Sequence, residues 1–224
     1  MKILGIDTTT KFLCLGLYAR GKSYEYNLEV GRNLSALLAV TIQRALSAAE
    51  LKIADIGYFA CGLGPGSFTG MRIGLATIKG LSIVRDKPVI GIPTLDILAR
   101  NALPEDALIV PALDARRGLI YCCSYKNERG LLRRKSEYAL LSLDEFIKKF
   151  NRHPVILGDA VSVYGDKMLS GMKGARLLDK DYWFPAPRNL MDLALAKIKA
   201  GQFSSALTVK PIYLYPKECQ IKTR

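Results

Sequence analysis

One stretch decides the fold, and it runs Cys61-Gly62-Leu63-Gly64-Pro65-Gly66-Ser67-Phe68-Thr69-Gly70-Met71-Arg72-Ile73-Gly74. Its five glycines predict backbone conformations that other residues avoid, or backbone that another group approaches closely. The apolar run at 56–61 predicts a short buried strand before the turn, and residues 71–85 predict a helix after it, with Thr69 as its N-cap. A turn between a strand and a helix points backbone N–H groups at one spot, which is typical of an anion site.

This glycine-rich turn matches neither common nucleotide-binding fingerprint. Residues 64–70 hold one residue too many for G-x-G-x-x-G, and no Lys-Ser/Thr pair follows the glycines as a P-loop requires. The spacing favours a structural tight turn over a phosphate site, and both interpretations stay open. The candidate residues of the turn are Gly62, Gly64, Gly66, Ser67, Thr69 and Gly70.

Composition narrows the class of protein. The 224 residues, half of them hydrophobic, can bury a full core and allow one large or two small domains. No apolar run resembles a signal peptide or a membrane span, so we expect a cytoplasmic protein with no membrane partner. The five cysteines lack C-x-x-C spacing and indicate reduced core residues. The single histidine, His153, argues against metal sites built on histidine pairs and against a Ser-His-Asp nucleophile.

The charge balance favours a polyanion nearby. A formal net charge of +13 supplies attraction to phosphates that does not depend on sequence. The densest basic runs lie at 116–117, 133–135 and 148–149, and no aromatic RNA-binding motif accompanies them. Direct nucleic-acid contact and a merely solvated surface are both open. The candidate contact residues are Arg133, Arg134 and Lys135.

The two halves of the chain show the same layout. An Asp follows the first strand of each half, as Asp7 and Asp114, and a hairpin turn follows at Arg20-Gly21 and at Arg129-Gly130. Two copies of one unit explain this pattern, with domains at 1–103 and 104–224. The predicted strands are 2–6, 12–19, 22–30, 56–61, 88–91, 108–113, 119–125, 131–138, 155–157 and 176–178. The predicted helices are 34–49, 71–85, 94–101, 143–150 and 188–200, and the tail at 206–215 is expected to be extended.

Tandem units with an Asp turn after each first strand resemble the actin, hexokinase and sugar-kinase superfamily. This resemblance implies an α/β fold of two RNase H-like units, with mixed sheets flanked by helices. Within the superfamily, the chain resembles the TsaB (YeaZ) family along nearly its whole length. The landmarks are Ile6-Asp7-Thr8-Thr9, the run from Gly64 to Gly74, Gly91-Ile92-Pro93-Thr94-Leu95, Leu113-Asp114-Ala115-Arg116, Gly158-Asp159 and Pro211-Ile212-Tyr213-Leu214.

The family resemblance implies a function. TsaB proteins are non-catalytic subunits required for threonylcarbamoylation of adenosine 37 in tRNAs that read codons beginning with A. The resemblance implies a catalytic paralogue, TsaD, as the partner, and TsaE as an associated ATPase. It also implies a homodimer when the chain is alone, no cofactor on the chain itself, with any ATP bound by the partner subunits, and tRNA contact through the complex.

Two features of the residues agree with this division of labour. One histidine cannot supply the histidine pair that a partner of that type needs for its metal. The second Asp turn, 114–118, carries Ala and Arg side chains where an approaching phosphate needs bare glycine backbone. The chain also departs from the family, because Asn33-Leu34-Ser35 stands where a His-Ser-Glu-like segment opens the first helix. The effect of that departure is open.

The helices at 34–49 and 71–85 carry more apolar surface than one sheet face can cover, which predicts a protein–protein interface. The alternative is that the second domain or the last helix covers them. In the family these two helices form the homodimer and the contact with TsaD, so a charge at Leu38 or Ile78 is expected to leave a folded monomer. The candidate interface residues are Leu37, Leu38, Thr41, Ile42, Ala45, Ile73, Gly74, Thr77, Ile78 and Leu81.

Two other functions compete with the scaffold interpretation. A minimal sugar or acyl kinase of the same superfamily would use Asp7 as general base and the glycine-rich turn for phosphate. It would also need a second glycine-rich phosphate turn and a substrate domain, and the sequence shows neither. An M22-type peptidase is a weaker alternative, because the sequence offers neither a histidine pair nor a nucleophile–base pair.

Overall fold

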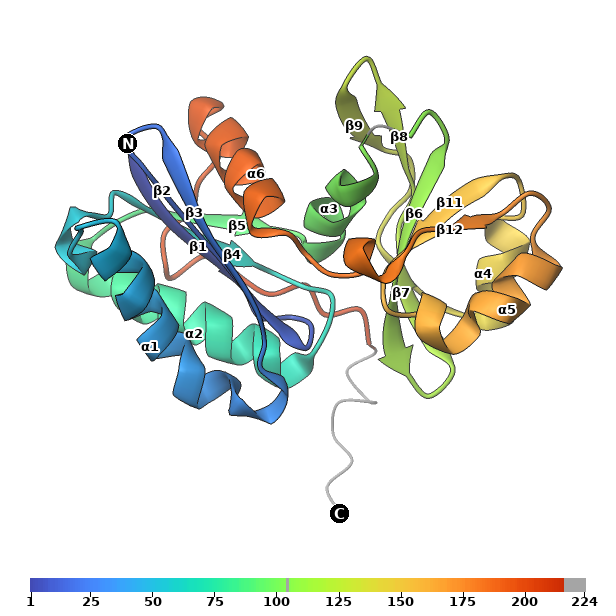
Figure 1. Ribbon diagram of the computed structural model, residues 1–224, viewed down its shortest axis with the longest axis horizontal. Coiled ribbons are helices and arrows are strands. Elements are labelled where there is room, and N and C mark those ends of the chain that lie inside the picture. Colours follow the sequence, from blue (N-terminus) through green and yellow to red (C-terminus); the bar gives the residue numbers. More distant parts are fainter. Residues whose placement is uncertain (104, 216–224) are drawn as a thin grey trace. The chain divides into compact units, whose positions relative to one another are not determined.

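The computed structural model describes residues 1–103 and 105–215 and divides the chain into two compact units. Unit 1 consists of Met1–Ile97 and Pro185–Pro211, and unit 2 of Leu98–Phe184 and the segment that begins at Ile212. Each unit has its own mixed sheet flanked by helices (Figure 1). The expected α/β architecture of two units is therefore confirmed.

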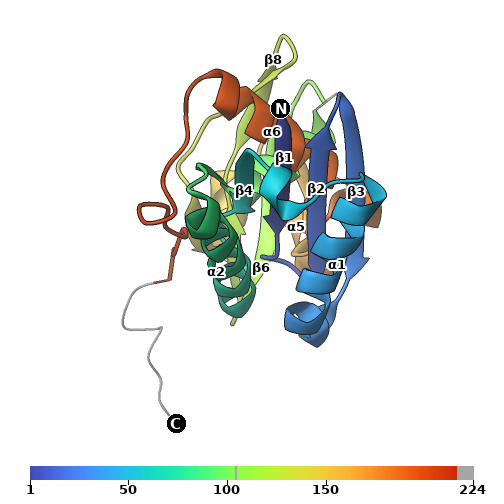
Figure 2. The ribbon, with the colours of Figure 1, turned by 90° about the vertical axis from the view of Figure 1, so that its left-hand side faces the viewer.

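Unit 1 is built on a five-stranded sheet of order β3-β2-β1-β4-β5. Strand β1 pairs antiparallel with β2 and parallel with β4. Helices α1 and α2 lie on one face of this sheet, and α6 lies on the other (Figures 1 and 2). The elements of unit 1 are β1 (Lys2–Asp7), β2 (Phe12–Ala19), β3 (Lys22–Glu29), α1 (Leu34–Ala48), β4 (Tyr58–Gly62), α2 (Phe68–Arg85), β5 (Val89–Ile92) and α6 (Pro187–Lys199); α3 (Thr94–Ala99) begins in unit 1 and runs into unit 2.

The position of α6 explains why the units are not continuous in sequence. Gly5 and Gly16 are partners on β1 and β2, and the side chain of Met191 occupies the space that a Cβ at either glycine would need. Because Leu190, Met191 and Ala194 are buried in this contact, the helix belongs to the unit 1 core. The predicted domains, 1–103 and 104–224, are wrong in this respect: the first unit ends at Ile97 and regains residues 185–211.

Unit 2 repeats the strand order of unit 1. Its sheet has the order β10-β7-β6-β11-β12, and β8 pairs with both β6 and β9. The two-copy layout predicted from the Asp turns is visible in this correspondence, because the order β3-β2-β1-β4-β5 recurs strand for strand. The elements are β6 (Leu108–Arg116), β7 (Leu119–Cys122), β8 (Tyr125–Glu128), β9 (Leu131–Arg134), β10 (Ala139–Ser142), α4 (Leu143–Lys149), β11 (Pro154–Leu157), α5 (Val161–Gly171) and β12 (Arg176–Leu177).

Several predicted elements differ from the structure. The strand predicted at 119–125 is interrupted at 123–124, and the strand predicted at 131–138 ends at Arg134, before a further strand that begins at Ala139. Helix α5 was not predicted, because its β-branched residues and two glycines have weak helix propensity. The N-cap of α2 is Ser67 rather than Thr69: the Ser67 hydroxyl accepts a hydrogen bond from the Gly70 N–H at 3.2 Å.

Cys14, Cys61, Cys122 and Cys123 are free thiols buried in the two units, as expected, and Cys219 lies outside the described residues. None of the helices in the described residues combines the length and hydropathy needed to cross a bilayer.

Candidate functional site

The Asp7 turn is closed by the chain itself. The Asp7 side chain is 1% exposed. Its Oδ1 accepts hydrogen bonds from the N–H and the hydroxyl of Thr9, at 2.8 and 2.7 Å, and its Oδ2 accepts one from the Thr94 hydroxyl at 2.7 Å. Thr94 Oγ1 in turn accepts the N–H of Gly64 at 3.1 Å. The carboxylate therefore joins β1, the glycine-rich turn and the start of α3.

The glycines of the turn are packed against the residues that follow β1. A Cβ added at Gly62 would come within 3.0 Å of the Asp7 side chain, and one at Gly70 or Gly74 would come equally close to Thr8. The Thr8 hydroxyl donates to the Gly70 carbonyl at 2.7 Å. A Cβ at Gly66 would strike the main chain of Thr9, whose carbonyl accepts the Ser67 N–H at 2.7 Å. Close backbone approach explains these glycines, and Gly64 adds a left-handed φ of 87°.

Burial raises the pKa of the Asp7 carboxyl above its usual range, although the hydrogen bonds from Thr9 and Thr94 oppose this. The raised pKa determines the direction in which the stability of the fold changes with pH. Between the unfolded pKa of about 3.9 and the higher folded pKa, the folded state holds a proton that the unfolded state has lost, so stability falls as pH rises through this window.

We therefore expect wild-type protein to lose stability relative to Asp7→Asn as pH rises from about 4, because the amide cannot ionise. Urea unfolding midpoints of both proteins across this range measure the difference. A difference that stays constant with pH would show that the Asp7 carboxylate ionises in the folded state as easily as in the unfolded chain.

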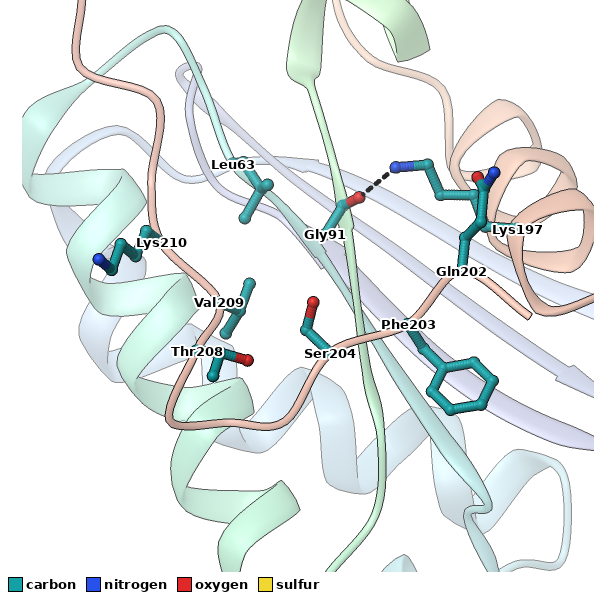
Figure 3. Close-up of a pocket in the computed structure, with 9 residues that line it drawn as sticks. All are labelled: Leu63, Gly91, Lys197, Gln202, Phe203, Ser204, Thr208, Val209 and Lys210. Carbon is teal, nitrogen blue, oxygen red and sulfur yellow. Dashed lines mark hydrogen bonds between the residues drawn. The ribbon is translucent and has the colours of Figure 1, made fainter. Parts of the chain in front are cut away.

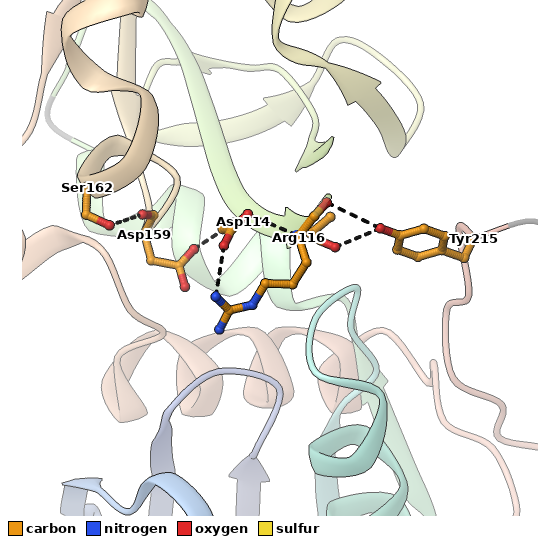
Figure 4. Close-up of polar contacts among 6 residues, drawn as sticks. Asp114, Arg116, Asp159, Ser162 and Tyr215 are labelled. Atoms are coloured by element: carbon orange, nitrogen blue, oxygen red, sulfur yellow. Dashed lines mark hydrogen bonds and ion pairs between the residues drawn. The ribbon is translucent and has the colours of Figure 1, made fainter. Parts of the chain in front are cut away.

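The corresponding turn of unit 2 is a tight hairpin rather than a phosphate loop (Figure 4). The Asp114 carboxylate accepts the N–H of Arg116 at 2.9 Å and pairs with the Arg116 guanidinium at 3.4 Å. The Asp114 N–H donates to Asp159 at 2.8 Å, and the Tyr215 hydroxyl donates to the Ala115 carbonyl at 2.7 Å. Arg116 and Arg117 adopt left-handed φ angles and are exposed, as is Gly118. Within the part of the chain that the structure describes, no group of three His, Cys, Asp or Glu residues could hold a metal ion.

A pocket of about 340 Å³ opens in unit 1 between β5 and the segment after α6 (Figure 3). Lys197 reaches into it and donates to the Gly91 carbonyl at 2.7 Å, and burial lowers the pKa of its ammonium group. In the described residues no hydrogen bond joins Lys197 to the hydroxyl of Ser204 or Thr208, and of the lining residues only Leu63 and Gly91 belong to motifs that the sequence singled out. The lining residues are Leu63, Gly91, Lys197, Gln202, Phe203, Ser204, Thr208, Val209 and Lys210.

The structure corrects the predicted interface on α1 and α2. Six of its ten residues are buried in unit 1, so they do not belong to its accessible surface. Gly74 packs on Thr8, and the Thr41 hydroxyl donates to the Leu37 carbonyl at 2.8 Å within α1. The physical reason is that the core stripe and the expected surface stripe of each helix are adjacent, and the sequence alone placed the boundary between them wrongly. The buried residues are Leu38, Thr41, Ile42, Ala45, Gly74 and Ile78.

An accessible stripe of apolar and small residues remains on each helix. On α1, the side chain of Leu37 is 38% exposed and that of Val40 is 47% exposed. On α2, the stripe recurs every three or four residues, and a Cβ at Gly80 would meet nothing within 4 Å. The sequence prediction missed Val40, Ala76, Gly80 and Val84. We call this set the helix stripe: Leu37, Val40, Ile73, Ala76, Thr77, Gly80, Leu81 and Val84.

The predicted basic run is divided between the two sides of a strand. Arg133 and Arg134 end β9, so their side chains point to opposite faces. Arg134 stacks over the Tyr138 ring at 4.5 Å and lies 4.0 Å from Glu137. Lys135 pairs with Glu128. Arg134 and Lys135 thus each form an ion pair within the described chain, and Arg133 forms none there.

Comparison with known proteins identifies the family. A family model described as TsaD, tRNA N6-adenosine threonylcarbamoyltransferase, matches residues 28–191. The tRNA threonylcarbamoyladenosine biosynthesis protein TsaB of Escherichia coli (strain K12) is 28% identical over 220 residues, covering 96% of this chain and 94% of that protein. TsaB of Bacillus subtilis (strain 168) is 30% identical over 180 residues, covering 79% of this chain and 78% of that protein.

A solved structure described as YeaZ from Pseudomonas aeruginosa has the same fold, with a TM-score of 0.83 at 24% identity, and the match covers 95% of this chain and 99% of that one. The expected resemblance is therefore confirmed by both sequence and fold. This chain belongs to the TsaB (YeaZ) family of tRNA threonylcarbamoyladenosine biosynthesis proteins.

Proposed function

We propose that this chain is a non-catalytic subunit required for threonylcarbamoylation of adenosine 37 in tRNAs that read codons beginning with A. It binds and supports a TsaD-like catalytic partner in the cytoplasm, with a TsaE-like ATPase associated, and it forms a homodimer when alone. Any ATP is bound by the partner subunits. The names of the relatives, biosynthesis proteins of this modified nucleoside, support the pathway.

The observation that carries the non-catalytic role is the closed Asp7 turn. A kinase of this superfamily would need the Asp7 carboxylate free to take a proton from its substrate. Here that carboxylate is 1% exposed and accepts three hydrogen bonds from Thr9 and Thr94. The glycines that would cradle a phosphate are in contact with Thr8 and Thr9 instead.

The peptidase alternative finds no support in the described residues. His153 is exposed at the start of β11, and its N–H donates to the Lys173 carbonyl at 2.9 Å. The free thiols of Cys14, Cys61 and Cys122 are buried, and burial raises the pKa of each, which disfavours the reactive thiolate. One solved structure with a similar fold is described as having similarity to a peptidase. A shared fold does not imply shared chemistry, so this description does not support a peptidase activity of this chain.

The helix stripe supports the scaffold role, because accessible apolar surface on a helix is typical of protein interfaces. The hydroxyl of Thr77 donates to the Ile73 carbonyl at 2.9 Å, so the one polar group in the middle of the stripe is already satisfied within α2. Gly80 leaves room for a partner helix to approach closely. We propose that the TsaD-like partner and the second copy of this chain compete for this surface.

The isolated chain is expected to show no ATPase, kinase or peptidase activity, because both Asp turns are occupied by contacts within the chain. Phosphate release from ATP by purified protein, with and without tRNA, measures this. Turnover that disappears in Asp7→Asn would contradict the non-catalytic role, whereas turnover that survives the substitution would indicate a contaminating ATPase.

A further inference from the structure

Hairpin β8–β9 of unit 2 places two cations directly opposite each other. Lys126 on β8 is the cross-strand partner of Arg133 on β9, so both side chains lie on one face. Like charges in such a pair destabilise a sheet unless something anionic lies over them. Among the named strand pairs that the structure describes, no other places two cations opposite each other, although an isolated parallel bridge also pairs Arg152 with Lys173. We call this surface, with Lys126, Arg133 and the turn residue Arg129, the hairpin face.

The hairpin face has a surplus of positive charge that the chain itself does not neutralise. Glu128 is the acidic group on this face, and it is held by Lys135. The pKa of Glu128 is lowered first by that hydrogen bond, and the positive charges of Arg133 and Lys126 lower it further. Lys126, Arg133 and Lys135 therefore all interact with the single carboxylate of Glu128. Lys126, Arg129 and Arg133 are exposed and form no ion pair with any residue that the structure describes.

A comparable hairpin of unit 1, β2–β3, lacks this arrangement, although its counterpart in unit 2 by strand order is β7–β10 rather than β8–β9. Strands β2 and β3 also turn at an Arg-Gly pair, Arg20-Gly21, and Arg20 has a φ of 53° where Arg129 has 54°. Yet the pairs nearest that turn are Ala19 with Lys22 and Tyr18 with Ser23, and no two cations oppose each other. The opposed cations are therefore a property of the unit 2 hairpin and not a requirement of this type of turn.

We propose that the hairpin face binds the phosphate backbone of the tRNA substrate. This deepens the proposed function, on which it rests for the identity of the polyanion. A row of phosphates is the partner that fits, because it offers several charges to several cations without requiring an apolar contact. Arg134 and Lys135, which the basic run suggested, are instead held within the chain by Tyr138 and Glu128. We therefore assign the phosphate contact to Lys126 and Arg129, together with Arg133.

The test compares Lys126→Gln/Arg133→Gln with a matched control, Arg20→Gln/Lys22→Gln, which removes the same charge from the unit 1 hairpin. The probe is an unmodified transcript of a tRNA that reads a codon beginning with A. Its affinity is measured over a range of salt concentrations, for the isolated chain and for the complex with the TsaD-like partner. Thermal unfolding and gel filtration of the same samples report the fold and the partner association.

We expect the hairpin variant to bind tRNA on the order of tenfold more weakly at 0.15 M salt, and to reduce the slope of log K against log salt by about 1.5–2. The control should match wild type. The melting temperature of the hairpin variant should stay the same or rise, because the substitution relieves like-charge repulsion. A purely structural role for these cations predicts the opposite change in melting temperature.

Equal tRNA affinity of the hairpin variant and wild type would overturn the proposal, and so would an equal loss in the control, which would indicate a diffuse charge effect. Aggregation without loss of affinity would identify the cations as protection of the β9 edge. Failure of the proposed function would give a different result, because the wild-type chain would then form no complex with the TsaD-like partner. In that case, tRNA binding by the isolated wild-type chain and the isolated hairpin variant would still test the role of the hairpin face.

Discussion

Gly80→Arg is expected to abolish association with the TsaD-like partner and to leave a folded monomer. Gly80 lies within the helix stripe on α2, where an added side chain meets open space. Replacing a mid-helix glycine with arginine favours the helix by roughly 0.5–1 kcal/mol, so the fold should become slightly more stable. In a complex the guanidinium would be buried among apolar groups without a partner, at a cost of several kcal/mol, or more than a hundredfold in Kd.

Co-purification with the partner and thermal unfolding of the same protein measure these two effects. Ile78→Glu is the contrasting variant. Ile78 is fully buried in the core of unit 1, so a carboxylate there should unfold the unit rather than yield a soluble monomer. The sequence-based expectation for Ile78 and Leu38 is corrected in this way. If Gly80→Arg still binds the partner with wild-type affinity, the helix stripe is not the interface.

The second large effect concerns the glycines that hold the Asp7 turn. Gly74→Ala would push its Cβ against the Thr8 hydroxyl and is expected to cost about 1–3 kcal/mol of stability. Gly70→Ala should cost more, because its Cβ would meet the carbonyl of Thr8, and backbone yields less than a side chain. Urea unfolding of each variant gives the free-energy change.

Gly80→Ala is the matched control, since it changes the same residue type on the same helix in open space and should stabilise the protein by about 1 kcal/mol. Thr8→Ala removes the atom against which Gly74→Ala clashes. The double variant Thr8→Ala/Gly74→Ala should therefore be more stable than the sum of the two single changes predicts. If Gly74→Ala proves as harmless as Gly80→Ala, the turn is not held by close packing.

Most of the fold was predictable from the sequence, because its signals are local. Apolar runs bounded by turn residues predicted β1 and β2, and the Arg-Gly turns predicted the hairpins. The recurrence of an Asp after the first strand of each half predicted two copies of one unit. The domain boundary was not predictable in this way, because the return of α6 to unit 1 depends on Met191 filling space beside Gly5 and Gly16, a contact between distant segments.

The sequence predicted the general nature of the site, a closely approached glycine-rich turn and two helices with an exposed apolar side, but not all of the residues that form it. Glycine density showed that backbone is approached closely at 62–74, but the group that approaches, Thr8 and Thr9, lies about 60 residues away in sequence. Periodicity shows that a helix has an apolar side, but it does not show where the core stripe ends and the exposed stripe begins. For this reason Leu38 and Ile78 were assigned to the surface, while Gly80 and Val84 were missed.

The scaffold role is tested most directly by the threonylcarbamoyladenosine content of tRNA from cells that lack their own copy of this protein and carry a variant in its place. Asp7→Asn should restore the modified nucleoside as wild type does, because the buried carboxylate takes part in no chemistry. Gly80→Arg should fail to restore it although the protein is folded and present at normal abundance. Restoration by Gly80→Arg, or loss of the nucleoside in a stably folded Asp7→Asn protein, would contradict a role as a non-catalytic, partner-binding subunit.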